Sequence, residues 1–232
     1  MRNLLLLILV SFTLLTRPAY SKTYPNKPIS ADSVFEQQKN WIIKWFSDRK
    51  IENPKYNRKY NSIRFDVLNR LKNTNLVQVE SKDIEGIAEW KEDTIYYTPA
   101  VIKYPEYNSV FAHELGHDAF PVIRSFDGNI KNDMERWMIK LITESISNSD
   151  NGSFYRYYLS KKYYHQPEEI YARICAFRFA CKLEPNQNLS LSDLAILSSK
   201  IQSREIDDDN SKDLLMLVDD PRELLKLLNN LP

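Results

Sequence analysis

The residues that could do chemistry lie in one short stretch, His113-Glu114-Leu115-Gly116-His117. On a helix, side chains four residues apart share a face, so His113 and His117 would present two imidazoles to one point. Zinc binds neutral imidazole nitrogens at about 2.0–2.1 Å, and a catalytic zinc site keeps one position open for water. Glu114 lies one step around the helix, from where it can take a proton from that water without becoming a ligand. The spacing therefore predicts metal-assisted hydrolysis of an amide bond.

The alternative is an ordinary amphipathic helix with two solvated histidines. Two observations favour zinc. The chain has three histidines in all, and two of them fall in this stretch. Its neighbours are apolar, which predicts a buried helix in which a carboxylate and two imidazoles without a metal would be costly. These neighbours are Val110, Phe111, Ala112, Leu115, Ala119 and Phe120.

A catalytic zinc site has three protein ligands as a rule, so a third ligand must come from elsewhere. A histidine six residues after His117 is absent, because Ile123 holds that position. A carboxylate from a later helix is therefore expected, and four residues are candidates: Glu135, Glu144, Glu168 and Glu169.

The surroundings of Glu169 favour it over Glu144. Glu168 is the next choice. Ala172 follows one helical turn later, and so small a residue would let its helix pack closely against Gly116. Arg173 follows Glu169 by four residues, which is the helical spacing at which it can hold the carboxylate in place. The metal ligands expected from the sequence are His113, His117 and Glu169, with Glu114 as the catalytic base.

The motif at His113–His117, followed by a distant glutamate in Glu169-Ile170-Tyr171-Ala172-Arg173, resembles the gluzincin pattern of zinc metallopeptidases. The second segment is similar to one in small bacterial and phage-associated zincin-like domains. The resemblance covers about residues 110–180. It implies that His113, His117 and Glu169 bind zinc and that Glu114 is the base. Gluzincins usually add a tyrosine or histidine that stabilises the oxyanion, and Tyr164 and His165 are the candidates here.

The fold class expected is α+β and mainly helical, with a small antiparallel sheet or hairpin before the active-site helix. Residues 76–80, 86–90 and 94–98 have the composition of strands. In zinc peptidases such a sheet usually precedes the motif helix and lends an edge strand to the substrate. Residues 50–59 are expected to form a connection, Pro121 to end the motif helix, and the acidic residues 205–210 to form a solvated loop.

Length and composition allow a single domain and exclude some partners. The chain has 232 residues, of which 43% are hydrophobic, and a net charge of +1. The apolar fraction is enough for a core. There is no basic stripe that would indicate nucleic acid and no glycine-rich phosphate loop. The expected partner is a protein or peptide substrate.

The first 21 residues have the layout of a secretory signal peptide. A short basic start precedes the apolar run Leu4–Leu15, and small residues at Ala19 and Ser21 fit cleavage after Ser21. The run is too short for a comfortable membrane span. The sequence therefore predicts an exported bacterial protein, secreted or periplasmic, in which residues 22–232 form one zincin-like domain. The other function considered is a non-catalytic zincin-like module that binds a protein or a cell-wall polymer.

Overall fold

Helices form most of the described chain, as the sequence predicts. The structure is a computed structural model that describes residues 30–84, 86–104, 106–125, 133–149 and 166–232. The helices are α1 (Ala31–Asp48), α2 (Pro54–Asn73), α3 (Ala100–Lys103), α4 (Val110–Ser125), α5 (Asp133–Asn148), α7 (Pro167–Ala180), α8 (Leu191–Gln202), α9 (Asp209–Leu217) and α10 (Pro221–Asn230). The strands are β1 (Asn75–Gln78), β2 (Ala88–Lys91) and β3 (Thr94–Tyr97). The signal peptide predicted for residues 1–21 lies outside the described residues.

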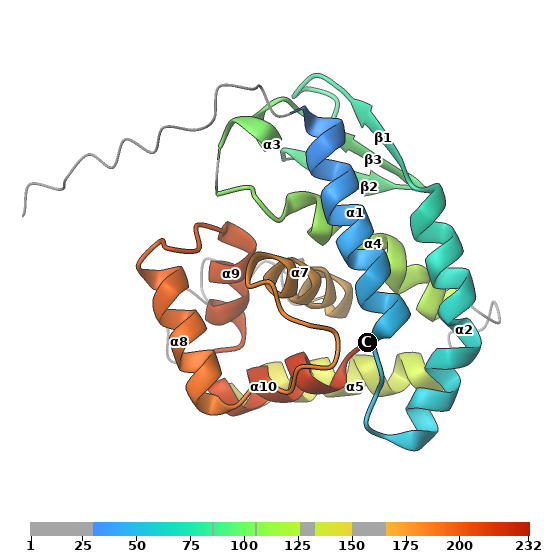
Figure 1. Cartoon of the computed structure of the whole chain (residues 1–232), viewed down its shortest axis with the longest axis vertical. Coiled ribbons are helices and arrows are strands. Elements are labelled where there is room, and N and C mark those ends of the chain that lie inside the picture. Colours follow the sequence, from blue (N-terminus) through green and yellow to red (C-terminus); the bar gives the residue numbers. More distant parts are fainter. Residues whose placement is uncertain (1–29, 85, 105, 126–132, 150–165) are drawn as a thin grey trace, which may run out of the picture.

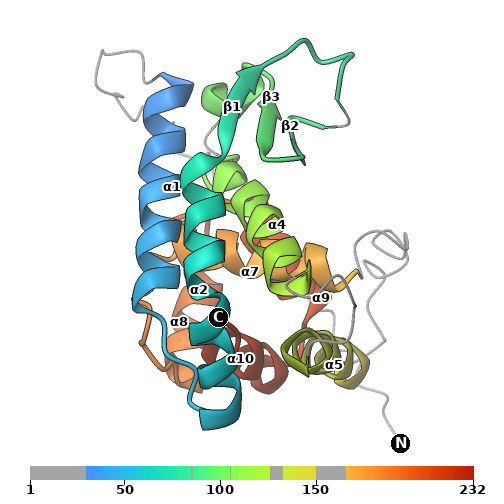
Figure 2. The same ribbon diagram turned by 90° about the vertical axis from the view of Figure 1, so that its right-hand side faces the viewer.

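The helices surround α7, which crosses the middle of the molecule in Figures 1 and 2. Helices α1 and α2 run side by side along one flank, and α5 and α10 lie at the end opposite the sheet. Every residue of α7 from Glu169 to Arg178 is buried, so this helix has no solvent face in its middle. Within the described residues, no helix combines the length and the apolar character needed to cross a membrane.

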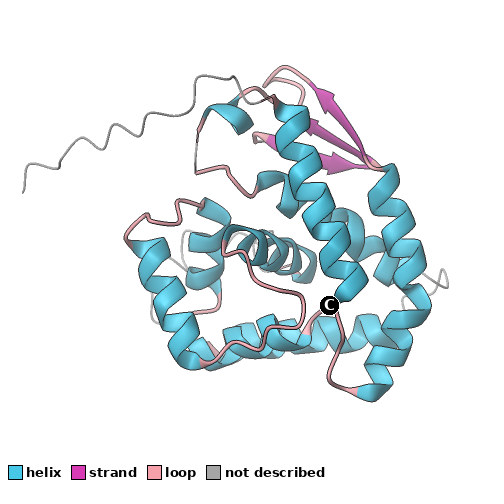
Figure 3. Cartoon of the chain, in the orientation of Figure 1, coloured by secondary structure: helices cyan, strands magenta, loops and turns pink. Residues whose placement is uncertain are grey.

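The sheet is small and lies at one end of the helical body, as Figure 3 shows. Its strand order is β1-β3-β2, with β2 and β3 paired antiparallel as the predicted hairpin. The expectation of an antiparallel sheet is wrong for β1, which pairs parallel with β3 and places Leu76 opposite Ile95. The cause is that β3 and not β2 lies beside β1. Strand β3 takes the central position because its Ile95 and Tyr97 side chains are buried in the core.

Two element boundaries differ from the sequence prediction. Helix α2 begins at Pro54, inside the stretch expected to be a connection. The Asn53 side chain accepts a hydrogen bond from the Lys55 amide, and the fully buried Tyr60 hydroxyl donates to the Phe46 carbonyl at 2.6 Å. Helix α4 continues past Pro121 to Ser125, where an end was expected. In both places the structure is helical where the local sequence predicts a break.

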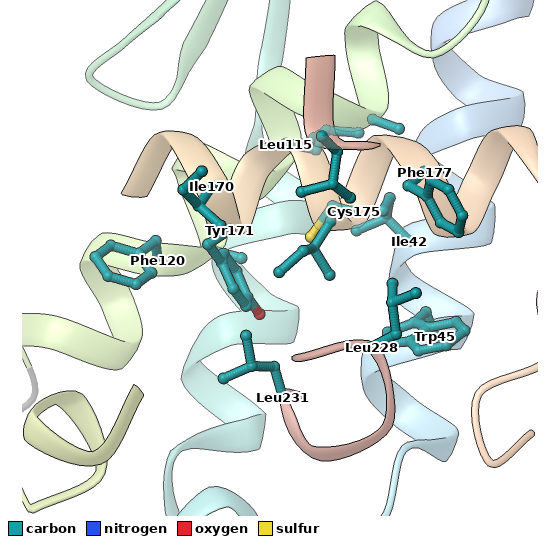
Figure 4. Packing of buried hydrophobic residues seen from close by; sticks show 14 of the residues in the cluster. Ile42, Trp45, Leu115, Phe120, Ile170, Tyr171, Cys175, Phe177, Leu228 and Leu231 are labelled. Carbon is teal, nitrogen blue, oxygen red and sulfur yellow. The ribbon is translucent and has the colours of Figure 1, made fainter. Parts of the chain in front are cut away.

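The core joins side chains from distant parts of the sequence around α7. Figure 4 shows the members that meet there: Ile42 and Trp45 of α1, Leu115 and Phe120 of α4, Ile170, Tyr171, Cys175 and Phe177 of α7, and Leu228 and Leu231 near the C-terminus. Helix α7 also contacts α1, α4, α5, α9 and α10, so its position is set by several parts of the fold.

Two buried arginines, one on α7 and one after α1, bind the backbone of the C-terminal stretch. Arg178 of α7 donates to the carbonyls of Leu228, Leu231 and Pro232 at 2.7–2.9 Å. Arg49, after α1, donates to Leu231 at 3.1 Å and to the Pro185 carbonyl at 2.7 Å. Burial, together with the neighbouring positive charge of Arg178, lowers the pKa of Arg49 to about 9. Backbone carbonyls thus hold these guanidinium groups, so the stretch that ends at Pro232 is fastened to the helix that carries Glu169.

Helices α4 and α7 approach each other closely at Gly116. A Cβ atom on Gly116 would lie 2.8 Å from the Ala172 Cα and 3.2 Å from the Cys175 Cβ. The first contact is with backbone, which cannot move aside as a flexible side chain could. The sequence prediction that Gly116 lets the helix of Ala172 pack closely is therefore confirmed.

Substituting Gly116 with Ala should destabilise the protein by about 1–3 kcal/mol, because the added methyl group forces α4 and α7 apart. Alanine has the higher helix propensity by about 1 kcal/mol, so an open site would give the opposite sign. Urea unfolding would measure the difference. Ser199→Ala on the exposed face of α8 is the control, and its stability should change by less than about 0.5 kcal/mol. A Gly116→Ala variant more stable than the wild type would show that the helices can separate without cost.

Candidate metal centre

The described structure brings two histidines of α4 and a glutamate of α7 to one point. The Nε2 atoms of His113 and His117 lie 3.1 Å apart. The Glu169 carboxylate lies 3.2 Å from His117 Nε2 and 3.6 Å from His113 Nε2. These three residues offer ligand atoms that all lie within 4.8 Å of one another. Within the described residues, this is the group of histidines, cysteines and carboxylates that could hold a metal ion.

The separations fit a shared metal ion. Ligands at about 2.0–2.1 Å in a tetrahedral arrangement lie about 3.3 Å from one another, close to the three separations found here. His113 is 7% exposed, and its Nδ1 has no hydrogen-bond partner within the described residues, so the polar contacts of its ring are those of Nε2. Burial, with the charges of His117 and Arg173, lowers the pKa of His113 well below its ordinary value. The imidazole is therefore neutral, which is the form that binds a metal.

Glu169 is held in place by Arg173, as the sequence predicts. The Arg173 guanidinium donates to Glu169 Oε2 at 2.8 Å and to the Glu169 carbonyl at 3.2 Å. Both side chains are almost fully buried, at 3% and 4% exposure. A buried carboxylate needs such a partner, since an unpaired one would be strongly destabilising. Asp213 of α9 lies 3.8 Å from the Arg173 Nε, on the other side of the guanidinium.

Glu114 lines the same cleft as the three candidate ligands, and a different element holds its side chain. Its Oε2 accepts a hydrogen bond of 2.9 Å from the Trp90 amide on strand β2, and Glu114 does not belong to the three-residue group. Burial raises the pKa of Glu114 to about 7, while His117 and the Trp90 amide favour its ionised form. The hairpin therefore sets the position of this carboxylate, and the chain without metal can exchange a proton there near neutral pH.

Helix α4 owes its start to α1. The Gln38 amide nitrogen donates to the Asn108 carbonyl at 2.8 Å, and the Gln38 Oε1 accepts from the Ala112 amide at 2.7 Å. A helix leaves its first amides without partners, and here a side chain from another helix supplies one. Ser109, directly before α4, donates to the buried Asp208. Gln38 gave no signal in the sequence, because it lies more than 70 residues before the helix that it caps.

A second unpredicted contact joins α4, α2 and the hairpin. Asp118, next to His117, is fully buried and accepts from the Arg70 Nε at 2.6 Å and from the Thr74 hydroxyl. Arg70 also pairs with Asp93 in the hairpin turn at 2.9 Å and lies over the Trp90 ring at 5.5 Å. The Arg70 side chain thus fixes the distance between the two histidines and the strand that holds Glu114.

The group opens into a cleft of about 990 Å³. Three other described cavities measure about 390–480 Å³ and lie away from the histidines. Strand β2 is an edge strand of the sheet, and its Ala88, Glu89 and Trp90 form one wall. Helices α4, α7 and α9 form the others. A peptide could therefore reach the histidines and Glu114 from solvent.

The other sequence candidates fall in different places. Glu144 lies on α5, is exposed and pairs with Lys140 at 3.6 Å, so it does not join the group. Glu168 lines the cleft beside Glu169 without joining it. The side chain of Glu135 lies outside the described residues, as do Tyr164 and His165, the two candidates for oxyanion stabilisation.

Comparison of the chain with protein-family models, with curated proteins and with solved structures found no match.

The raised pKa of Glu114 predicts a pH dependence of stability in the metal-free protein. A carboxyl group whose folded pKa exceeds its unfolded value destabilises the fold as pH rises from about 4.5 to about 7. Glu114→Gln removes this penalty and can still accept the Trp90 hydrogen bond. With a chelator present, the variant should be more stable than the wild type by on the order of 3 kcal/mol at pH 8, and equal to it near pH 4. Urea unfolding across this range would measure it. A difference that does not change with pH would contradict the prediction.

Proposed function

We propose that this protein is an exported zinc-dependent peptidase with a zincin-like fold. The observation that carries the proposal is the convergence of His113, His117 and Glu169 on one point, with Glu114 beside them but outside the ligand group. Two imidazoles and one carboxylate, with a position left open, form a ligand set used by catalytic zinc in peptidases. The resemblance of the two motifs to gluzincins supports the same assignment.

Each residue of the site has a separate role in the proposed reaction. His113, His117 and Glu169 would hold zinc, which supplies Lewis acidity toward a carbonyl oxygen and lowers the pKa of water. Glu114 would take a proton from the attacking water and return it to the leaving amine. The Trp90 amide keeps Glu114 aimed into the cleft, and Arg173 keeps Glu169 aimed at the histidines. The edge strand β2 would align an extended peptide by backbone hydrogen bonds.

The presence of Glu114 favours an enzyme over a binding module. A zinc ion that only stabilises structure needs no base beside it, and a closed site would use four protein ligands. Here a buried carboxylate with a raised pKa faces the same cleft as the three ligand atoms. Burial of such a group costs stability, and the proposed proton transfer gives a reason for that cost.

The ligand assignment predicts the zinc content of two matched variants. Wild-type protein purified with zinc should hold about one zinc ion per chain. Glu169→Gln should bind zinc at least about 10-fold more weakly, because it removes a charged ligand. Glu144→Gln, which removes the same charge from α5, should bind zinc as the wild type does. Elemental analysis after dialysis against a chelator series would measure both. An equal loss of zinc from the two variants would contradict the assignment of Glu169 as the third ligand.

The role of Glu114 predicts loss of activity without loss of metal. Glu114→Gln should retain zinc and lower the rate of hydrolysis of a mixed peptide substrate by about 10²-fold or more. Product formation would be followed by mass spectrometry, together with zinc content of the same samples. Glu92→Gln, in the hairpin turn and outside the cleft, is the control. Hydrolysis by Glu114→Gln at the wild-type rate would overturn the mechanism.

A further inference from the structure

The cleft that contains the candidate metal centre is strongly acidic. Among the described residues that line it, there are seven carboxylates and one guanidinium. The carboxylates are Glu89, Glu106, Glu114, Glu168, Glu169, Asp209 and Asp213, and the guanidinium is Arg173. The whole chain, in contrast, is nearly neutral, with 32 basic and 31 acidic residues. The charge of the cleft is therefore a local feature of the tertiary structure.

The metal centre accounts for only part of this charge. Glu114 and Glu169 belong to the proposed machinery, and Arg173 is bound to Glu169 at 2.8 Å. Five carboxylates remain, and they come from four different segments: strand β2, the residues before α4, helix α7 and helix α9. Since they do not share one helix face, no single solvated surface explains them.

A favourable interaction with a helix end explains the presence of some of the five carboxylates but not of the others. Glu168 and Asp209 lie in the first turns of α7 and α9, where the helix dipole favours acidic residues. Asp209 also pairs with Lys212 at 2.9 Å. Glu89 lies within strand β2, and Glu106 precedes α4 by several residues, so neither stabilises a helix end. Both are half-buried in the cleft wall, where partial burial of a carboxylate costs free energy that no helix end offsets.

Tertiary contacts hold the acidic segments in place around the cleft. The Asp209 amide donates to the Glu106 carbonyl at 3.1 Å, and Tyr107 and Asp208 form a β-bridge. Asp208 is fully buried and accepts from Ser109 and Ser211, in contrast to the solvated loop expected from the sequence. Helix α9 is thereby fastened to the residues that precede α4, so its carboxylates face the same space as Glu89.

We propose that the cleft selects peptides that carry lysine or arginine side chains next to the scissile bond. This inference rests on the proposed function and names its substrate class. Carboxylates grouped on low-dielectric walls focus their field, so they attract cations and repel acidic peptides more strongly than the same charges spread over an open surface. We assign the selection to Glu89 on the edge strand β2 and to Glu106 before α4, because both line the cleft and neither stabilises a helix end.

Binding to the inactive Glu114→Gln protein tests this without relying on turnover. The probes are two fluorescent, N-acetylated peptides of equal length, one rich in lysine and one rich in glutamate, followed by anisotropy. Acetylation removes the α-amine, so that attraction must come from side chains. The lysine peptide should bind about 10-fold or more tightly than the glutamate peptide at low salt, and the difference should shrink at high salt. Equal binding of the two peptides would overturn the inference.

Two charge-matched double variants in the same background locate the effect. Glu89→Gln with Glu106→Gln should weaken binding of the lysine peptide about five-fold. Glu36→Gln with Asp66→Asn removes the same charge from exposed positions on α1 and α2 and should leave binding nearly unchanged. Equal weakening by both pairs would show that net charge alone attracts the peptide, which overturns the inference.

Hydrolysis assays separate this inference from the proposed function. If the wild type hydrolyses both peptides at the same rate, the proposed selectivity is wrong and the proposed peptidase activity is supported. If neither peptide is hydrolysed but the lysine peptide binds in the cleft as described, the proposed peptidase activity is wrong and the proposed preference for cationic peptides is supported. Faster hydrolysis of the lysine peptide, reduced by the Glu89 and Glu106 substitutions, supports both.

Discussion

The structure depends on the close approach of two buried helices at Gly116. One helix carries His113, His117 and Glu114, and the other carries Glu169 and Arg173. In the chain they are separated by residues 126–166, so no short backbone connection sets their spacing and packing does. A hydrogen atom in place of a methyl group at Gly116 permits a separation at which the Glu169 carboxylate reaches both imidazoles. A larger residue at that point would clash with the backbone at Ala172, so the helix that carries Glu169 would have to shift.

Burial of charge is the second constraint, and each buried group has a partner from another element or another turn. Arg173 holds Glu169, Arg70 holds Asp118, and the Trp90 amide holds Glu114. These pairs contribute little net stability, because desolvation offsets most of their attraction. Their effect is to define positions: an imidazole, a carboxylate and a strand are kept within a few ångströms of one another. Arg178 does the same for α7 through backbone carbonyls near the C-terminus, and Arg49 binds that same stretch from the end of α1.

The sequence predicted the parts of the site that follow from helical spacing. His113 and His117 are four residues apart, Glu169 and Arg173 are four residues apart, and small residues at 116 and 172 indicate where two helices can touch. In each case the relation is local and follows from 3.6 residues per turn. The contacts that escaped prediction join residues far apart in the chain: Gln38 with Ala112, Arg70 with Asp118, and Trp90 with Glu114. Any buried polar residue could have been the partner in such a contact, so spacing along the sequence does not select one.

The sequence by itself determined the helical class, the hairpin and the pair of imidazoles, because these follow from periodicity and residue type. It favoured Glu169 among four candidate glutamates without deciding between them. Only the tertiary structure decided that β1 runs parallel to β3, that α2 begins at Pro54, and that Glu144 lies away from the histidines while Glu169 lies beside them. It also decided that acidic residues from four separate segments of a nearly neutral chain gather around one cleft. The physical reason is that distance in space between elements depends on how their buried faces fit together, and no single segment of sequence contains that information.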